Sequence, residues 1–291
     1  MGRVLDSTIN EISTNRLKNL ENKLASDVIF FYGPIQPSIE KNFRDFLESL
    51  KKDGLNRNRL SIILNTPGGS VETVEKMVVI TRHFYEEVDF IVPDYAMSAG
   101  TIFCMSGDRI YMDYASSLGP IDPQVFNGSH WVPALGYLDK VEDFIEKSKK
   151  NLLTQAEFLM LKEQDLAMLK SYEQARDLTI SLLKDWLVKY KFKNWDQHET
   201  TPELKGTTVT IEQKNQRAED VAKILGDNKI WHSHGRSIGL QTLRSVLKLR
   251  IEDYSEDEGL SSLVREYNDM ICDYVARMNF KNFLHSRKNF F

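Results

Sequence analysis

The chain has 291 residues, of which 41% are hydrophobic and 27% charged, and its formal net charge is −4. These values are typical of a soluble globular protein with room for one large domain or two small ones. The weakly negative net charge excludes the basic surface that dominates nucleic-acid binding, so we expect no nucleic-acid partner.

The sequence also limits the compartment and the cofactors. Its two cysteines, Cys104 and Cys272, lie far apart and provide no disulfide framework, which favours a reducing compartment. No run approaches the roughly 20 apolar residues of a membrane span, and residues 1–17 lack the apolar core of a signal peptide. We therefore expect a cytoplasmic protein without a membrane span. His232 and His234 lack the neighbouring ligands of a zinc site, so no metal or other cofactor is expected.

The first half of the chain alternates between short apolar runs and helical patterns. Residues 1–25 predict a polar helical lead-in. The expected strands are 27–33, 60–64, 88–92 and 108–112, and the expected helices are 38–50, 71–87 and 98–105. Strands that alternate with helices predict a parallel sheet with helices on its faces.

The second half is mainly helical. Residues 135–190 contain no proline and no glycine after Gly136, which predicts two helices that break near residues 151–154. Thr154 and Glu157 have the spacing of a capping box. This arm either packs on its own domain as a helical hairpin or forms a contact between copies of the chain.

The last third predicts shorter elements. Further helices are expected at 217–225, 238–249 and 260–278, with an extended piece at 207–211 and a packed or frayed basic and aromatic tail. We therefore divide the chain into the lead-in 1–25, a central domain 26–250 that includes the arm 135–192, and a helical C-terminal tail 251–291.

Three short motifs follow one another between Leu64 and Gln124: LNTPGGSV, YAMSAGT and SSLGPIDPQ. The glycines of the first motif allow a tight turn whose N–H groups face outward. Ser98, in the second motif, follows an apolar run and begins a helical pattern, where N-terminal N–H groups favour negative charge. An exposed hydroxyl beside preorganised hydrogen-bond donors is the minimum apparatus for acyl transfer.

In this order and at this spacing, the three motifs resemble those of the Clp protease and crotonase superfamily. Within it, the chain is most similar to the serine dehydrogenase proteinase family, which is related to signal peptide peptidase A. The resemblance covers about residues 25–130 and is faint from 200 to 250. It implies an α/β fold built as a spiral of strand-strand-helix units, here with a helical insertion and a helical C-terminal tail.

The resemblance also implies roles for individual residues. Ser98 would be the nucleophile, and the backbone N–H groups of Gly69 and Ala99 would form the oxyanion hole, with Gly68 serving the turn. Clp-type proteases carry their histidine about 25 residues after the nucleophile, where this chain has Asp122 and no histidine. His234 falls near the position of their aspartate, so the two roles would be exchanged: His234 is the base and Asp122 orients it. Such an exchange is chemically acceptable because a triad is defined by geometry rather than by chain order.

Three other interpretations stay open: a lysine base, His130 as the base, and no base at all. A Ser–Lys dyad, as in the signal peptide peptidase A group, would use Lys140 or, less well placed, Lys147. Asp139 and Glu142 flank Lys140, however, and would raise its pKa rather than lower it. His130 could reach the site if its loop folds back. Alternatively, the protein has no base and has kept the fold without the chemistry.

These observations lead to three hypotheses of function. The first is a serine peptidase that binds a peptide or protein substrate as a strand beside the glycine loop and cleaves it. The second is a crotonase-type enzyme acting on an acyl thioester, against which Ser98 and the missing paired glutamates argue. The third is a non-catalytic oligomeric scaffold that uses the helical arm. Because the superfamily commonly builds oligomers, a homo-oligomer is expected, and the absence of a GxxxxGK[ST] loop assigns any ATP-driven unfolding to another chain.

Overall fold

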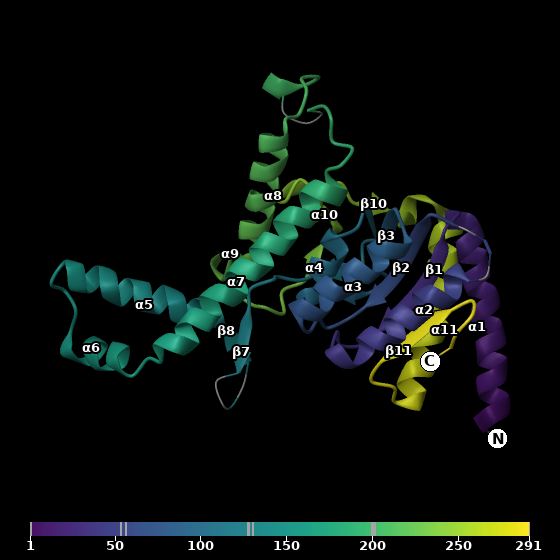
Figure 1. The fold of residues 1–291 in the computed structure, drawn as a ribbon, viewed down its shortest axis with the longest axis horizontal. Helices are drawn as coiled ribbons and strands as arrows, with labels where there is room; N and C mark the ends of the chain where they lie inside the picture. Colours follow the sequence, from purple (N-terminus) through teal and green to yellow (C-terminus); the bar gives the residue numbers. More distant parts are fainter. Residues whose placement is uncertain are drawn as a thin grey trace.

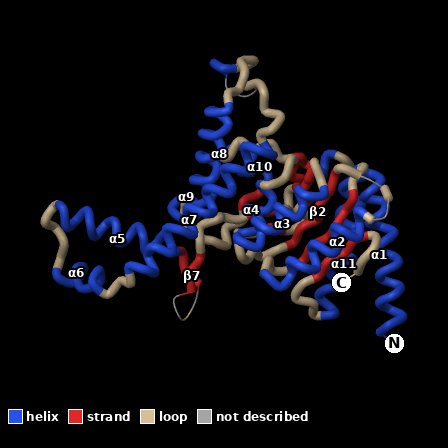
Figure 2. The backbone as a smooth tube through the Cα atoms, in the orientation of Figure 1, coloured by secondary structure: helices blue, strands red, loops and turns tan. Residues whose placement is uncertain are grey.

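A six-stranded sheet forms the centre of the computed structural model, which describes residues 2–52, 54–55, 57–126, 129, 131–198 and 202–290 (Figures 1 and 2). Its strands lie in the order β10-β5-β3-β2-β1-β11, and all neighbours are parallel except β1 and β11. The strands are β1 (Asp27–Tyr32), β2 (Arg59–Asn65), β3 (Glu87–Ile91), β5 (Arg109–Met112), β10 (Glu252–Asp253) and β11 (Phe283–Ser286). The four strands expected in the first half are thus confirmed as β1, β2, β3 and β5.

Helices cover both faces of this sheet, as the alternating pattern predicts (Figure 1). On one face lie α2 (Glu40–Lys51), α3 (Val71–Phe84) and α4 (Ala99–Met105), and on the other lie α1 (Gly2–Leu24) and α11 (Glu258–Met278). Strand β1 shows why: Ile29 and Phe31 join the core on the α2 side, whereas Val28 and Phe30 join the core on the α11 side. Side chains alternate along a strand, so a strand that is apolar at every position is buried on both faces.

The outer edge of the sheet is formed by the last part of the chain. Strand β11 pairs antiparallel with β1, with Ile29 opposite Ser286 and Tyr32 opposite Phe283. The tail is therefore packed rather than frayed, but it is not wholly helical as expected, because β10 and β11 add strands to both edges of the sheet. Pairing β11 with β1 covers backbone groups that would otherwise form an exposed edge. The three-part division of the chain remains a prediction.

The arm consists of three helices rather than the two expected. They are α5 (Ala134–Lys149), α6 (Gln155–Lys162) and α7 (Leu166–Trp186), followed by a π-helical turn at Leu187–Lys191. The capping box of Thr154 and Glu157 is confirmed at the start of α6, and Asp165 caps α7, which explains the second break. Helices α5 and α6 project from the body, and α7 runs back into it (Figure 1).

Three further expectations need correction. The helix expected at 217–225 begins earlier, as α8 (Ile211–Gly226), because Thr210 and Gln213 form a capping box, while Thr208 in the expected extended piece makes an isolated β-bridge to Gln197. The helix expected at 238–249 is only α10 (Leu240–Ser245), preceded by strand β9 (Ile238–Gly239). Sequence patterns also missed helix α9 (Asn228–Trp231) and the hairpin of β7 (Gln124–Phe126) and β8 (Trp131–Pro133). Short elements such as these are fixed by tertiary pairing more than by local pattern.

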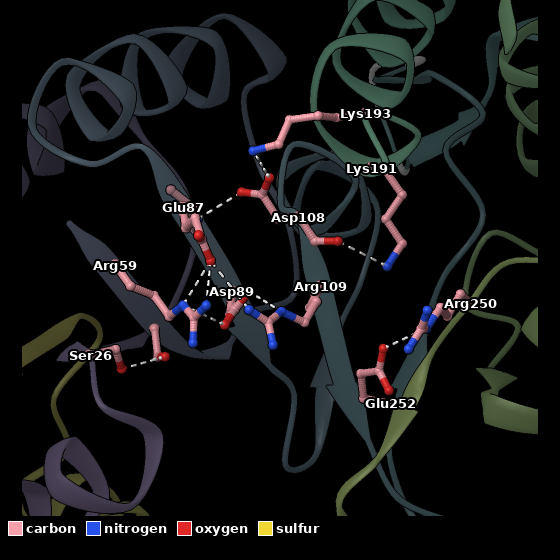
Figure 3. Close-up of polar contacts among 12 residues, drawn as sticks. Ser26, Arg59, Glu87, Asp89, Asp108, Arg109, Lys191, Lys193, Arg250 and Glu252 are labelled. Carbon is pink, nitrogen blue, oxygen red and sulfur yellow. Dashed lines mark hydrogen bonds and ion pairs between the residues drawn. The ribbon is translucent and has the colours of Figure 1, made fainter. Parts of the chain in front are cut away.

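Charged side chains gather at the amino ends of the parallel strands (Figure 3). Asp89 is only 2% exposed, and its burial raises the pKa of the carboxyl group to about 6, although Arg109 lies 3.4 Å away and opposes this shift. Arg59 donates from Nε to Glu87 over 2.9 Å, and Arg109 contacts the same carboxylate at 3.2 Å. Ser98 follows the carboxyl end of β3. The charged cluster therefore lies at the opposite end of the strands from Ser98.

His285 in β11 should make the fold sensitive to acid. Its side chain is fully buried between Tyr267 Oη, 2.7 Å from Nδ1, and Thr14 Oγ1, 3.3 Å from Nε2, and burial lowers its pKa to about 3. The unfolded chain, with a histidine pKa near 6.5, then binds a proton that the folded chain excludes, so stability falls as pH drops from about 6.5 towards 3. Between pH 7 and pH 5, we expect the wild type to lose roughly 2 kcal/mol more unfolding free energy than His285→Gln. Urea unfolding at both pH values measures this, and equal losses would contradict it.

Candidate active site

Ser98 lies at a sharp turn between strand β4 (Tyr95–Ala96) and helix α4. Its backbone angles are φ 52° and ψ −117°, a combination that non-glycine residues rarely adopt and that is concentrated at functional sites. An ordinary helix N-cap serine has extended backbone angles and a side chain bonded to the helix, and Ser98 has neither. Within the described residues its half-buried hydroxyl makes no hydrogen bond, so it is available to another group.

The glycine loop lies directly against this turn. A Cβ on Gly68 would lie 2.8 Å from Ser98 Cβ and one on Gly69 would lie 2.0 Å from Ile35 O, so neither position has room for a side chain. Both residues also have positive φ, 101° and 148°, which favours glycine. The Gly68 N–H donates to Thr66 Oγ1 over 3.0 Å, in keeping with a role in the turn.

Two backbone N–H groups near Ser98 remain unused. In the described part of the chain, neither Gly69 nor Ala99 donates a backbone hydrogen bond. Ala99 is the first residue of α4, where the N–H groups of a helix have no intrahelical acceptor. Free donors at this place are suited to negative charge that develops on an oxygen beside Ser98.

A small three-stranded sheet, β4-β6-β9, brings together three segments that are distant in the sequence. Strand β4, which leads to Ser98, pairs parallel with β6 (Ser117–Leu118), which leads to Asp122. Strand β9 pairs antiparallel with β6 and begins shortly after His234. Because β9 runs in the opposite direction, the residues before it lie at the same end as the residues after β4 and β6. The topology thus brings Ser98, Asp122 and His234 to the same end of this sheet.

Asp122 and His234 are in direct contact. His234 Nδ1 lies 2.8 Å from Asp122 Oδ1, and Gln124 Nε2 donates to Asp122 Oδ2 over 2.7 Å. The carboxylate is 1% exposed and the imidazole 25%, so the acid is buried behind a histidine that reaches the surface. A carboxylate only accepts hydrogen bonds, so a neutral His234 carries its proton on Nδ1 and leaves Nε2 as an acceptor.

Thr101 in α4 joins the serine turn to the segment that carries Asp122. Its Oγ1 accepts from the Gly119 N–H over 2.9 Å and lies 2.8 Å from Ala96 O and 2.9 Å from Gly119 O. A hydroxyl with three partners in a fully buried place fixes the distance between the two segments. Sequence reasoning missed the roles of Thr101 and Gln124, although both residues belong to the recognised motifs.

The other candidate bases lie in different surroundings. Lys140 is on α5 of the arm, 62% exposed, with Asp143 at 3.2 Å, and Lys147 binds Glu157 at 2.8 Å, a contact that raises the pKa of Lys147. A lysine base needs the opposite conditions, namely burial and a lowered pKa. His130 lies outside the described residues. No group of three or more histidine, cysteine or acidic side chains within the described residues could hold a metal ion.

A groove of about 360 Å³ lies beside the Asp122 segment, between the arm and α8. Ile121 and Pro123 line one side of it, and an ion pair between Lys229 and Asp139, 3.0 Å long, joins α9 to α5 next to it. None of the helices in the described ranges has both the length and the apolar character needed to cross a lipid bilayer.

A parallel sheet covered on both faces, with a serine turn beside a glycine loop, defines a mixed α/β protein of the ClpP and crotonase class. The chain belongs to the ClpP-like SDH-type serine proteinase family, whose model matches residues 52–222. The expected fold and family are thereby confirmed. The matched range includes Gly69, Ser98 and Asp122 and ends before His234.

The chain is also similar to individual proteins. Two uncharacterized proteins of Methanocaldococcus jannaschii are 30% and 31% identical to it over 126 residues, which is 43% of this chain. The matched part makes up 40% and 39% of those relatives, so the chain spans about two fifths of their length.

Two solved structures of the membrane-bound stomatin-specific protease 1510-N are distantly similar. A serine-to-alanine mutant is 12% identical with a TM-score of 0.46, covering 79% of this chain and 82% of that one. A lysine-to-alanine mutant in complex with a substrate peptide is 14% identical with a TM-score of 0.45, covering 78% and 75%.

Proposed function

We propose that this protein is a serine peptidase in which Ser98 is the nucleophile, His234 the general base and Asp122 the group that orients it. The observation that carries the proposal is the 2.8 Å contact between Asp122 and His234 at the end of the small sheet that leads into Ser98. A scaffold without chemistry has no need for a buried carboxylate paired with a partly exposed histidine at the end of the sheet where a strained serine lies.

The proposed reaction begins at Nε2 of His234. This nitrogen accepts the Ser98 Oγ proton while Oγ attacks the carbonyl carbon of the scissile peptide bond. The oxygen of the tetrahedral intermediate gains negative charge and accepts hydrogen bonds from the N–H groups of Gly69 and Ala99. The Asp122 carboxylate stabilises the imidazolium, which then gives its proton to the leaving amine, and water hydrolyses the acyl-enzyme in the same way.

The substrate we propose is an extended peptide or protein segment, bound through its backbone beside the glycine loop. One side of this loop is already occupied, because Ile35 N donates to Gly68 O over 2.8 Å and Ser70 N donates to Ile35 O over 2.9 Å. A substrate strand would therefore pair on the side that faces Ser98. Assembly into a homo-oligomer and a cytoplasmic location remain predictions.

Labelling with a fluorophosphonate, which reacts with activated serines, tests the nucleophile. We expect the wild type to be labelled on Ser98 and Ser98→Ala to be unlabelled, because only an activated hydroxyl attacks the probe. Mass spectrometry of the labelled peptide identifies the site.

Lys140→Ala is the matched control for the base, and it should be labelled as fast as the wild type because Lys140 is a solvated arm residue. Loss of labelling in Lys140→Ala would favour the dyad, and an unlabelled wild type across mildly acidic to alkaline pH would contradict the peptidase.

A further inference from the structure

Helix α11 carries a buried amide among apolar neighbours. Asn268 is 3% exposed and lies in the stripe by which α11 packs on the sheet, together with Val264, Tyr267 and Ile271. A side-chain amide placed in such a stripe destabilises the fold unless its hydrogen-bonding groups are satisfied. The partners of Asn268 therefore indicate what the residue does.

Asn268 completes a closed ring of hydrogen bonds with Asn65, the last residue of β2, and Asp94, in the loop between β3 and β4. Its Oδ1 accepts from Asn65 Nδ2 over 2.7 Å, and its Nδ2 donates to Asp94 Oδ2 over 2.9 Å. The ring closes where the backbone N–H of Asp94 donates to Asn65 Oδ1 over 3.3 Å. Each of the three residues thus contacts the other two, and Asn268 is the one that α11 contributes.

The two residues that Asn268 holds stand immediately before the two loops of the candidate site. Asn65 ends β2 and leads into the glycine loop, and Asp94 follows β3 and leads into the serine turn. The same number of residues separates Asn65 from Gly69 and Asp94 from Ser98. The next residue of each segment is paired as well. Thr66 N donates to Tyr95 O over 3.0 Å, one residue nearer to the candidate site on each segment.

We propose that Asn268 is a positioning residue that fixes the glycine loop against the serine turn, so that one residue of α11 supports the candidate site. The inference rests on the proposed function, because the spacing between the Gly69 N–H and Ser98 Oγ affects catalysis only if Ser98 is the nucleophile and the Gly69 N–H belongs to the oxyanion hole. An oxyanion hole works only when its donors are held close to their productive geometry. Helix α11 lies outside the range matched by the family model, so the site depends on a segment beyond that range.

The first test is the rate of fluorophosphonate labelling of Ser98 in Asn268→Leu, which keeps the size of the side chain and removes both of its hydrogen bonds. We expect the maximal labelling rate to fall by about 10- to 100-fold, since a displacement of about 1 Å can cost roughly 10²-fold. The probe concentration that gives half of that rate should change little, because binding is kept and alignment is lost. Asn268→Asp, which keeps the shape and can accept from Asn65 but cannot donate to Asp94, should be slowed in the same direction.

Ile271→Ala is the matched control, because Ile271 is fully buried in the same helix and makes no side-chain hydrogen bond to either loop. It should lower the melting temperature and leave the labelling rate near that of the wild type. In a double-mutant cycle, Asn65→Leu combined with Asn268→Leu should be no slower than the slower single variant, because both act through one ring. Equal rates for Asn268→Leu and the wild type, or equal slowing in Ile271→Ala, would overturn the inference.

Hydrogen–deuterium exchange separates this inference from the proposed function. In Asn268→Leu, peptides that cover residues 64–70 and 95–101 should exchange faster than in Ile271→Ala at matched stability. If the wild type is not labelled at all, the peptidase proposal fails, and exchange alone then decides about Asn268. Unchanged exchange in both peptides would overturn the positioning role whatever the labelling shows.

Discussion

Replacing His234 by asparagine should lower kcat/KM for peptide hydrolysis by about 10⁴- to 10⁶-fold, the range found when a triad histidine is removed. Asparagine is close to histidine in polarity and can still bond to Asp122, so the loop is kept while the base at Nε2 is lost. Asp122→Asn should cost about 10⁴-fold, because an amide can donate to Nδ1 and hold the imidazole in the wrong tautomer. Steady-state hydrolysis of a fluorogenic peptide measures both.

His232→Asn is the matched control for this prediction. His232 lies in the same loop, is exposed, and has φ 62°, a conformation that asparagine tolerates well. The same chemical change should therefore leave kcat/KM nearly unaltered. Retained activity in His234→Asn, or equal loss in both variants, would exclude His234 as the base and return attention to the alternatives.

Replacing Arg287 by methionine should destabilise the protein by about 3–5 kcal/mol, the usual effect of removing one partner from a buried ion cluster. Arg287 Nη1 lies 2.8 Å from Asp27 Oδ1 and also bonds to Glu21, and all three side chains are at most 5% exposed. Burial already raises the pKa of Glu21, and without Arg287 the one cation left near both carboxylates among the described residues would be Arg57, 3.5 Å from Glu21. Chemical denaturation at pH 7 measures the change.

Arg277→Met makes the same substitution at a solvated ion pair. Arg277 and Asp273 are 2.7 Å apart on α11, with side chains 76% and 61% exposed, so its loss should have little effect. Combining Arg287→Met with Glu21→Gln should recover part of the lost stability, because it removes one of the uncompensated charges. If Arg287→Met unfolds at the same denaturant concentration as Arg277→Met, the buried cluster does not stabilise the protein as predicted.

Much of the fold could be predicted from the sequence because its central strands are mainly apolar, with Ser61 and Asp89 as buried exceptions. The runs at Val28–Phe31 and Leu60–Leu64 indicate strands buried on both faces, and that pattern belongs to parallel sheets with helices on either side. Strand β11 could not be predicted in this way. Its sequence, FLHS, is short and contains a histidine, and it becomes a strand only through pairing with β1, which is remote in the chain.

The candidate site likewise has parts that local sequence patterns predict and parts that depend on distant contacts. Local motifs predict the glycine loop and the serine turn, because positive φ and a close approach to Ser98 demand glycine and leave a recognisable spacing. The resemblance led to the hypothesis that the histidine and aspartate of the triad have exchanged positions in the chain. The structure brings the side chains of Asp122 and His234 together. Their catalytic roles remain proposals. Asn268 gave no local signal, since a single asparagine in an amphipathic helix is recognisable as buried only once its partners are placed.

The order in which the segments of this protein are synthesised has a consequence for the cell. Ser98 and the glycine loop are made early, whereas His234 and Asn268 follow much later, and β11 later still. At about 5–20 residues per second, the ribosome needs on the order of 10 to 30 s to advance from Ser98 to Asn268. Under the proposed mechanism, the nascent chain carries Ser98 without its base until His234 has been made, so until then it should be unable to cleave itself or neighbouring nascent chains. On that proposal, the order of the segments in the chain delays proteolytic competence.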